Sequence, residues 1–313
     1  MQIAVAITCH NQHDMVRKTI EMLYDQPTKP GAVFVLSDAK PYWKLPGDRG
    51  NVIPLNNRGK YIGRCGNRNS VIEPFLSSGY DAIVFMDGDC YPDSEDFLGK
   101  YASLLTTHEL VFGTRRHDDV TMLKNPPSDL LTANMDNLWH CTAIDYSDLR
   151  VVSGAVKAWQ ESVTFDERLD LMLTGMIGWS CNFGFSRKGL AKLRKFQKRT
   201  YGLAEGIFDS EAFGDGWGYE DVAMGIDALY AGLDIWITDH VKVGHRSHDR
   251  TDGLFDHVKG RHKIMDRHRM LERYVKSRDL ILKTMIVSTL FYTAGLITGL
   301  ITEAVSLYKI LGL

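Results

Sequence analysis

Short apolar runs alternate with amphipathic stretches through the first third of the chain. Residues 2–8 are mostly apolar, which predicts a buried strand, and the next periodic stretch places Val16, Ile20 and Leu23 on one face of a helix. The elements predicted in this region are strands 2–8, 33–36, 51–55 and 82–86 and helices 14–24 and 68–76. Such alternation predicts an α/β fold with a mainly parallel sheet, which binds ligands at the carboxyl ends of its strands.

The pattern weakens between His117 and Leu173 and returns after it. The weak segment contains Pro126-Pro127 and several polar turns, so we expect a variable insertion or acceptor-facing loops there. Beyond it the pattern predicts a strand 179–186, a basic helix 188–199, a helix 220–231 closed by Gly232, and short strands 235–237 and 241–243. The second half therefore continues the α/β pattern.

The last segment differs in composition. Residues 284–302 are nineteen residues without a charge, and at about 1.5 Å per residue they could just cross a hydrocarbon core of about 30 Å. Gly295 and Gly299, however, lie in a stripe of small residues that would also let a helix pack closely on another helix. Two interpretations stay open: membrane attachment through 284–302, or a helix packed on the domain or in a homodimer. Basic residues before the run favour a membrane, with the rest of the chain at its cytoplasmic face.

Composition changes this picture little. With 313 residues, 44% of them hydrophobic, the chain can bury a full core as one unit. The formal net charge of −2 argues against a dedicated nucleic-acid binder. Residues 187–199 nevertheless carry seven basic side chains and no acid, either as a solvated helix face or as a contact for an anionic partner. The five cysteines contain no C-x-x-C pair, and the N-terminus has no basic leader, so we expect a cytoplasmic protein without a zinc knuckle.

Asp87-Gly88-Asp89 follows an apolar strand directly. Carboxylates on either side of a glycine can approach one divalent cation, while the glycine lets the backbone come close to a diphosphate. A plain solvated turn is the alternative, because acidic turns after strands are common.

Three segments of the first half resemble family 2 glycosyltransferases of the GT-A fold. They are Thr8-Cys9-His10-Asn11 before an amphipathic helix, the segment 63–69, and the strand that ends in Asp87-Gly88-Asp89. The second half resembles β-1,4-galactosyltransferases and bacterial chondroitin-type polymerases, in which a W-G-x-E-D run precedes a helix and a metal-binding histidine. That run is Trp217-Gly218-Tyr219-Glu220-Asp221 in this chain.

The resemblance implies a fold and a domain organisation. The fold is a Rossmann-like GT-A domain over residues 1–255, with a mainly parallel sheet and helices on both faces. Residues 1–115 form the nucleotide-sugar-binding half, and residues 116–255 form the acceptor half. Residues 256–313 lie outside the resemblance, and their composition predicts a basic and apolar helical tail that could anchor the chain to a membrane.

The resemblance also implies the donor and metal sites. Asp38 would hold the nucleobase or ribose, Arg68 would lie near the base or diphosphate, and Asp87 would contact the ribose or sugar. Asp89 would bind the metal together with His245, with His248 as the substitute ligand. Mn²⁺ or Mg²⁺ suits such a site, and the imidazole favours Mn²⁺.

Two adjacent acids carry the predicted chemistry. Asp221 would be the general base that takes the proton of an acceptor hydroxyl, and Glu220 would bind sugar hydroxyls. A dipole-complementing acid pair at a helix start is the plain alternative. Trp217, beside the flexible Gly218, and Trp179 would stack on sugar faces, although a single aromatic fits a core equally well.

The function predicted from these residues is metal-dependent, inverting transfer of a hexose from a nucleotide sugar, most simply a UDP-sugar, to an acceptor hydroxyl. The acceptor is a glycan or a lipid-linked molecule. The alternatives are transfer of a sugar to phage DNA, for which the run 187–199 could follow the phosphates, and a nucleotidyltransferase, which would leave His245 without a role.

Overall fold

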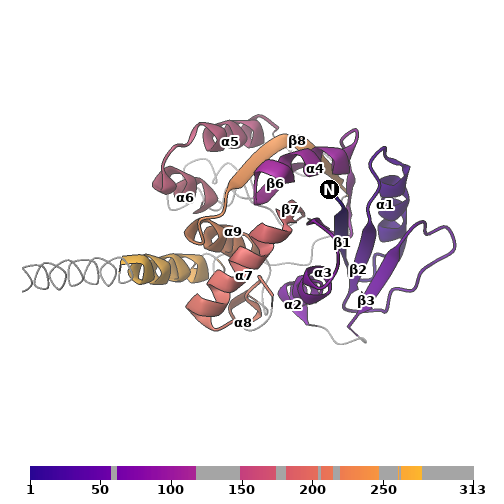
Figure 1. Cartoon of the computed structure of the whole chain (residues 1–313), viewed down its shortest axis with the longest axis horizontal. Helices are drawn as coiled ribbons and strands as arrows, with labels where there is room; N and C mark the ends of the chain where they lie inside the picture. The colour runs from indigo at the N-terminus through magenta and orange to yellow at the C-terminus, as the bar shows by residue number, and fades with distance from the viewer. Residues whose placement is uncertain are drawn as a thin grey trace, which may run out of the picture. The chain divides into compact units, whose positions relative to one another are not determined.

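The computed structural model describes residues 1–57, 62–117, 149–173, 181–203, 206–213, 219–246, 260 and 262–276. The chain forms two compact units, Met1–Ile264 and Met265–Leu313. The first unit contains the whole sheet, drawn in Figure 1. In the second unit residues 265–276 are helical.

The first half of the sheet is parallel. Its elements are β1 (Ile3–Cys9), α1 (His13–Asp25), β2 (Ala32–Ser37), β3 (Val52–Asn56), α2 (Gly63–Asn69), α3 (Ile72–Leu76) and β4 (Ala82–Met86). Strands β1, β2 and β4 are almost completely buried, as their unbroken apolar runs predict. β1 pairs in parallel with β2 and with β4, and β2 pairs in parallel with β3. The carboxyl ends of β1, β2 and β4 therefore meet at one edge of the sheet.

The second half is mixed. Its elements are β5 (Cys90–Pro92), α4 (Phe97–Thr107), β6 (Leu110–His117), α5 (Leu149–Glu161), α6 (Phe165–Leu173), β7 (Asn182–Ser186), α7 (Arg187–Tyr201), α8 (Ser210–Phe213), α9 (Glu220–Tyr230) and β8 (Ile235–His245). β7 is antiparallel to β4 and β6, β6 is parallel to β8, and β5 is antiparallel to β8. The complete strand order is β3-β2-β1-β4-β7-β6-β8-β5.

Helices cover both faces of this sheet, as predicted. α1 and α4 lie on one face, and α2, α3 and α7 lie on the other (Figure 1). On the second face, the Phe85 ring of β4 stacks on Phe183 of β7 at 4.7 Å between centroids, and Phe208 meets both rings edge-on. This aromatic cluster joins the two halves of the sheet, because β4 belongs to the first half and β7 to the second.

Three predicted elements differ from the structure. The helix predicted over 68–76 is two short helices, the first of which begins at Gly63 with a positive φ of 68°. The two strands predicted over 235–237 and 241–243 are one strand, β8, whose pairing with β6 shifts register between Phe112 and Thr114. The partly exposed Asp239 and the exposed His240 lie at this irregularity and interrupt the apolar pattern of β8. The strand predicted over 179–186 begins at Asn182, after a turn at Cys181, and residues 179–180 lie outside the described residues.

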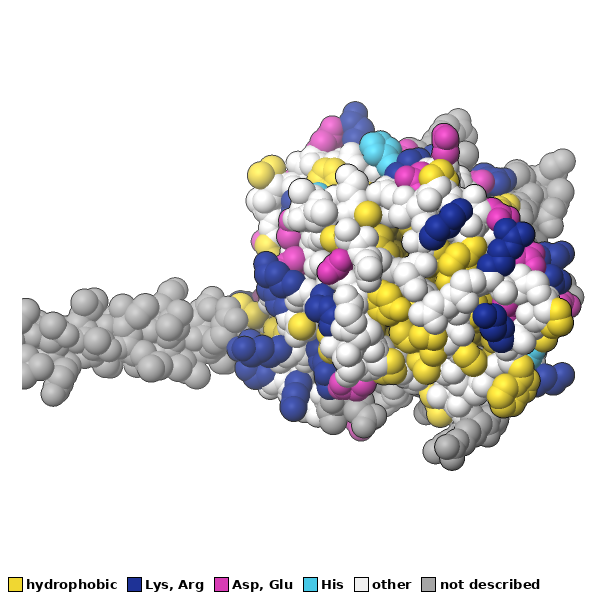
Figure 2. Space-filling view, turned by 45° about the vertical axis from the view of Figure 1, so that its right-hand side comes forward, with side chains coloured by type: hydrophobic (Ala, Val, Ile, Leu, Met, Phe, Trp, Pro, Cys, Tyr) yellow, Lys and Arg dark blue, Asp and Glu magenta, His cyan; other side chains and the backbone are white. Residues whose placement is uncertain are grey.

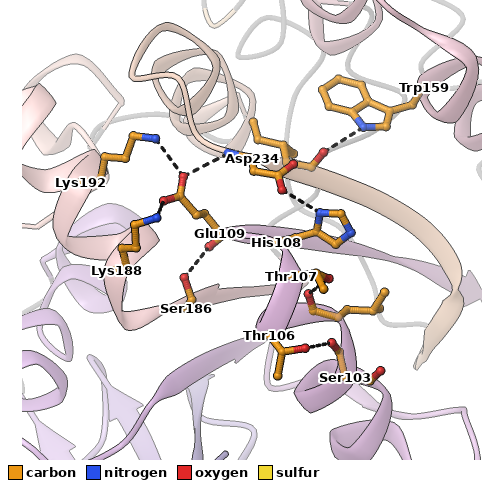
Figure 3. A network of polar contacts seen from close by, with 12 residues as sticks. Ser103, Thr106, Thr107, His108, Glu109, Trp159, Ser186, Lys188, Lys192 and Asp234 are labelled. Carbon is orange, nitrogen blue, oxygen red and sulfur yellow. Dashed lines mark hydrogen bonds and ion pairs between the residues drawn. The ribbon is translucent and has the colours of Figure 1, made fainter.

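Some basic residues of the run 187–199 form ion pairs and hydrogen bonds within the fold. The Glu109 carboxylate forms ion pairs with Lys192 Nζ at 2.9 Å and with Lys188 Nζ at 3.0 Å (Figure 3). It also accepts a hydrogen bond from the backbone N–H of Asp234 at 3.2 Å. Burial raises the pKa of Glu109, but the two lysines and this N–H lower it more, so that the net pKa is below its ordinary value. This network ties the start of β6 to α7 and to the turn before β8.

The guanidinium of Arg187 is also held internally, since it donates to the carbonyl oxygens of Leu76, Ser78 and Tyr80. Lys195, Lys198 and Arg199 remain on the exposed side of α7. On the face drawn in Figure 2, Lys and Arg lie among Asp and Glu, in line with the small net charge.

No helix in the described ranges is both long and apolar enough to span a bilayer. The predicted attachment segment 284–302 lies outside the described residues.

Candidate active site

Asp38 follows β2 at the carboxyl edge of the sheet. Its carboxylate is buried, and its Oδ1 lies 2.8 Å from Nδ1 of His10, a half-exposed side chain in the turn after β1. The two loops meet because β1 and β2 run in parallel register as far as the pair Cys9 and Ser37. The sequence placed Asp38 at this edge but gave no role to His10, although His10 belongs to the Thr8–Asn11 motif.

The Asp87-Gly88-Asp89 turn is held against the end of β1. A Cβ on Gly88 would lie 2.4 Å from the carbonyl oxygen of Thr8, so no other residue fits there without a shift of the backbone. Thr8 Oγ1 donates to Asp87 Oδ1 at 3.3 Å, and the backbone N–H of Cys90 donates to the Asp87 carbonyl at 3.0 Å. The turn therefore has a fixed position relative to β1.

Arg68 connects the two halves of the predicted site. Its Nη2 donates to Asp87 Oδ1 at 2.8 Å and its Nη1 donates to Glu220 Oε1 at 2.9 Å. Arg68 and Glu220 are both buried, whereas 26% of the Asp87 side chain is exposed. Burial lowers the pKa of Arg68, but the charges of Asp87 and Glu220 raise it more, so that the net pKa is above its ordinary value.

The sequence predicted separate contacts of Arg68 with the nucleotide and of Glu220 with sugar hydroxyls, whereas the structure pairs the two side chains across 152 positions of the chain. Those contacts with ligands stay predictions. The pairing shows in addition that the first turn of α9 is fixed to the end of β4.

Tyr219 sets the direction of α9. It has a left-handed backbone, with φ of 70°, directly before the helix, a conformation that is uncommon outside glycine. Glu220 and Asp221 occupy the first turn, where the helix dipole stabilises a carboxylate. Asp221 is half-buried, and its Oδ1 accepts the N–H of Val222 at 2.8 Å. Its carboxylate is therefore more open to solvent than that of Glu220.

Asp89 and His245 come together where β5 meets β8. Asp89 Oδ2 lies 3.4 Å from His245 Nε2, and both side chains are largely buried. The backbone N–H of Arg246 donates to the Asp89 carbonyl at 2.9 Å, which fixes the turn to the end of β8. A carboxylate and an imidazole at this separation fit a divalent cation such as Mn²⁺.

Cys90 joins these two residues. One ligand atom from each of Asp89, Cys90 and His245 lies within 4.8 Å of the others. A side-chain hydrogen bond with Cys181 and burial raise the pKa of the Cys90 thiol well above its ordinary value. Cys90 was not among the ligands predicted from the sequence, although its place directly after the Asp87-Gly88-Asp89 motif was a signal.

The other predicted site residues, Trp179, Trp217, Gly218 and His248, lie outside the described residues. Among the described ones, the structure brings together Arg68, Asp87 and Glu220 as one group, Asp89 and His245 as a second, and Asp38 with His10 as a third.

The architecture is similar to that of solved structures. The TarS 1–349 structure of S. aureus in complex with UDP-GlcNAc matches with a TM-score of 0.51 at 14% identity, over 80% of this chain and 60% of that chain. A second structure of TarS 1–349 matches with a TM-score of 0.50 at 14% identity, over 79% of this chain and 60% of that one. No protein-family model matches the chain, and no curated protein matches it in sequence.

This likeness concerns the fold. Together with the mainly parallel sheet and the helices on its two faces, it confirms the predicted Rossmann-like GT-A architecture. The chain spans about 60% of the length of the TarS structures that it matches.

Proposed function

We propose that this protein is a metal-dependent, inverting glycosyltransferase that moves a hexose from a nucleotide sugar to an acceptor hydroxyl. One observation supports the proposal above the others: Asp89 Oδ2 and His245 Nε2, 156 positions apart in sequence, lie 3.4 Å apart in a buried pair at the edge that holds Asp38 and Asp87. A GT-A fold with a cation site at this edge suits a diphosphate-linked donor.

The donor side of the site is built by β1, β2 and β4. In the proposal Asp38 contacts the nucleobase or ribose, Asp87 contacts the ribose or sugar, and Arg68 keeps Asp87 in place. Gly88 lets the turn pack against the Thr8 carbonyl, which keeps Asp87 and Asp89 at this edge of the sheet. A UDP-sugar is our proposed donor, and the similar TarS structure contains UDP-GlcNAc.

Asp221 acts as the general base in this proposal. It takes the proton of the acceptor hydroxyl while that oxygen forms a bond to the anomeric carbon, and the bond from that carbon to the diphosphate breaks. A cation held by Asp89 and His245 would stabilise the charge on the leaving diphosphate. Attack from the side opposite the leaving group inverts the configuration.

The acceptor side of the proposed site includes the first turn of α9. Glu220 is engaged by Arg68, so we propose that it positions Asp221 through the first turn of α9. Trp179 and Trp217, with Gly218, are proposed to contact sugars. A glycan or lipid-linked acceptor at the cytoplasmic face of a membrane would agree with the uncharged run 284–302.

A donor screen tests the proposal. Purified full-length protein is incubated with Mn²⁺ and a panel of UDP-, GDP- and CDP-sugars, and the released nucleoside diphosphate is measured. We expect release with one class of donor and loss of the activity in a chelator. No release with any donor, or an undiminished rate in the chelator, would contradict the proposal.

Two variants and a control sharpen this test. Asp89→Asn and His245→Gln should lose metal-dependent release while remaining folded, because each removes a ligand and little packing. The control is Asp239→Asn, which changes a partly exposed acid on the same strand as His245 and should keep the activity. Full activity in either ligand variant would exclude this metal site.

A further inference from the structure

We propose that the thiol of Cys90 is a third protein ligand of the divalent cation, beside Asp89 and His245. The inference rests on the proposed function, because it concerns the cation on which that function depends. It adds a sulfur to a site that the sequence predicted from oxygen and nitrogen donors alone.

Strand pairing places the Cys90 thiol next to the imidazole. Cys90 and His245 are directly opposite each other in the antiparallel β5–β8 pair, so their side chains emerge on the same face of the sheet. Asp89 reaches the same point from the preceding position. The register of two strands thus brings three different ligand types together.

The distances agree with a coordination shell. A tetrahedral ion with ligand bonds of about 2.0–2.3 Å holds its ligand atoms about 3.3–3.8 Å apart. Asp89 Oδ2 and His245 Nε2 are 3.4 Å apart, and Cys90 Sγ is 3.6 Å from Asp89 Oδ1. The third pair, Cys90 and His245, has its ligand atoms within 4.8 Å, so side-chain rotations that shorten this separation would bring all three donors to one ion.

Burial and chemistry favour binding at this point. Cys90 is fully buried, and Asp89 and His245 are nearly so, hence much of the desolvation cost has been met on folding. A thiolate prefers soft ions, so the site should favour Zn²⁺ or Cd²⁺ over Mg²⁺. The thiol proton passes to solvent when the metal binds.

Cadmium provides a direct test that needs no nucleotide sugar. Cd²⁺ is titrated into the full-length protein with a non-thiol reductant, and ultraviolet sulfur-to-cadmium charge-transfer absorption is recorded. We expect one equivalent of Cd²⁺ to give this absorption. Cys90→Ser should abolish it and weaken Cd²⁺ binding at least about tenfold, with a much smaller effect on Mg²⁺.

Cys181→Ser is the matched control, since it changes a buried cysteine that touches Cys90 and leaves the three ligands in place. It should keep the absorption. Undiminished absorption in Cys90→Ser, or its loss in Cys181→Ser alone, would overturn the proposal.

Two further variants decide the matter if circular dichroism shows that Cys90→Ser is unfolded. Asp89→Asn and His245→Gln retain every thiol but should lose the absorption; its persistence in both would overturn the proposal. Failure here is distinguishable from failure of the glycosyltransferase assignment. A Cys90-dependent absorption without any donor turnover would contradict the enzyme function and support the ligand.

Discussion

Replacing Arg68 with methionine would test whether the buried ion pairs hold the site together. Methionine has a similar length but no donors, so Asp87 and Glu220 would lose bonds of 2.8 and 2.9 Å. The Glu220 carboxylate is almost fully buried, and removing one partner from such a pair costs about 3–5 kcal/mol. Asp87 is better solvated, so its share of this loss is the smaller one.

Denaturation in urea, followed by circular dichroism, measures the loss as a fall in the transition midpoint. Arg17→Met is the control: Arg17 pairs with Glu21 at 3.1 Å on α1 where both are partly exposed, so its loss should cost at most about 1 kcal/mol. The effect of Arg68→Met should be nearly constant between neutral and mildly alkaline pH. A cation with a raised pKa contributes its stability fully below the ordinary value, and Arg68 titrates far above this range.

A double-mutant cycle completes the test. Glu220→Gln removes the charge that Arg68 neutralises, so the double variant Arg68→Met/Glu220→Gln should be less destabilised than the sum of its parts, by about 1–3 kcal/mol. The reasoning is refuted if the two effects add within about 0.5 kcal/mol, or if Arg68→Met costs no more than the Arg17 control.

Three other predictions concern the proposed base Asp221, the turn at Gly88 and the ion pairs of Glu109. Asp221→Asn should lower the rate of transfer by about 10²- to 10⁴-fold with unchanged donor binding, as single-turnover assays would show, and the product should have inverted configuration. A retained configuration would give Asp221 another role. Gly88→Ala should lower the free energy of unfolding by about 1–3 kcal/mol, because its Cβ meets backbone, whereas Gly79→Ala meets nothing within 4 Å and should be neutral in the same urea assay. Equal effects would contradict the close approach. Glu109→Gln should cost about 1–3 kcal/mol at pH 7. The pKa of Glu109 in the folded protein is below its ordinary value of 4.5, so the carboxylate stabilises the fold fully at pH values above 4.5. This stabilisation is lost as the pH falls through the pKa of the folded state. The gap between variant and native protein in thermal unfolding should therefore close in acid; a constant gap would refute the assignment.

Local pattern alone predicted most of the first half. β1, β2 and β4 are short apolar runs in the sequence. A short apolar run that alternates with amphipathic helices predicts a buried parallel strand from local sequence alone. Asp38 and Asp87 were correctly placed at strand ends for the same reason. The break at residues 70–71, by contrast, splits a stretch that reads as one helix, because residues throughout it remain compatible with helical spacing.

The α/β class, the strands of the donor half and the acids at the carboxyl edge follow from side-chain periodicity along a few residues, so they can be predicted without the fold. The pairing of Arg68 with Glu220 and the position of Cys90 opposite His245 across β5 and β8 arise only in the folded chain. Those contacts join positions more than 150 residues apart, and they depend on strand order, direction and register. A shift of one residue in the β5–β8 register would turn the Cys90 thiol away from the imidazole, and nothing in either segment alone fixes that register.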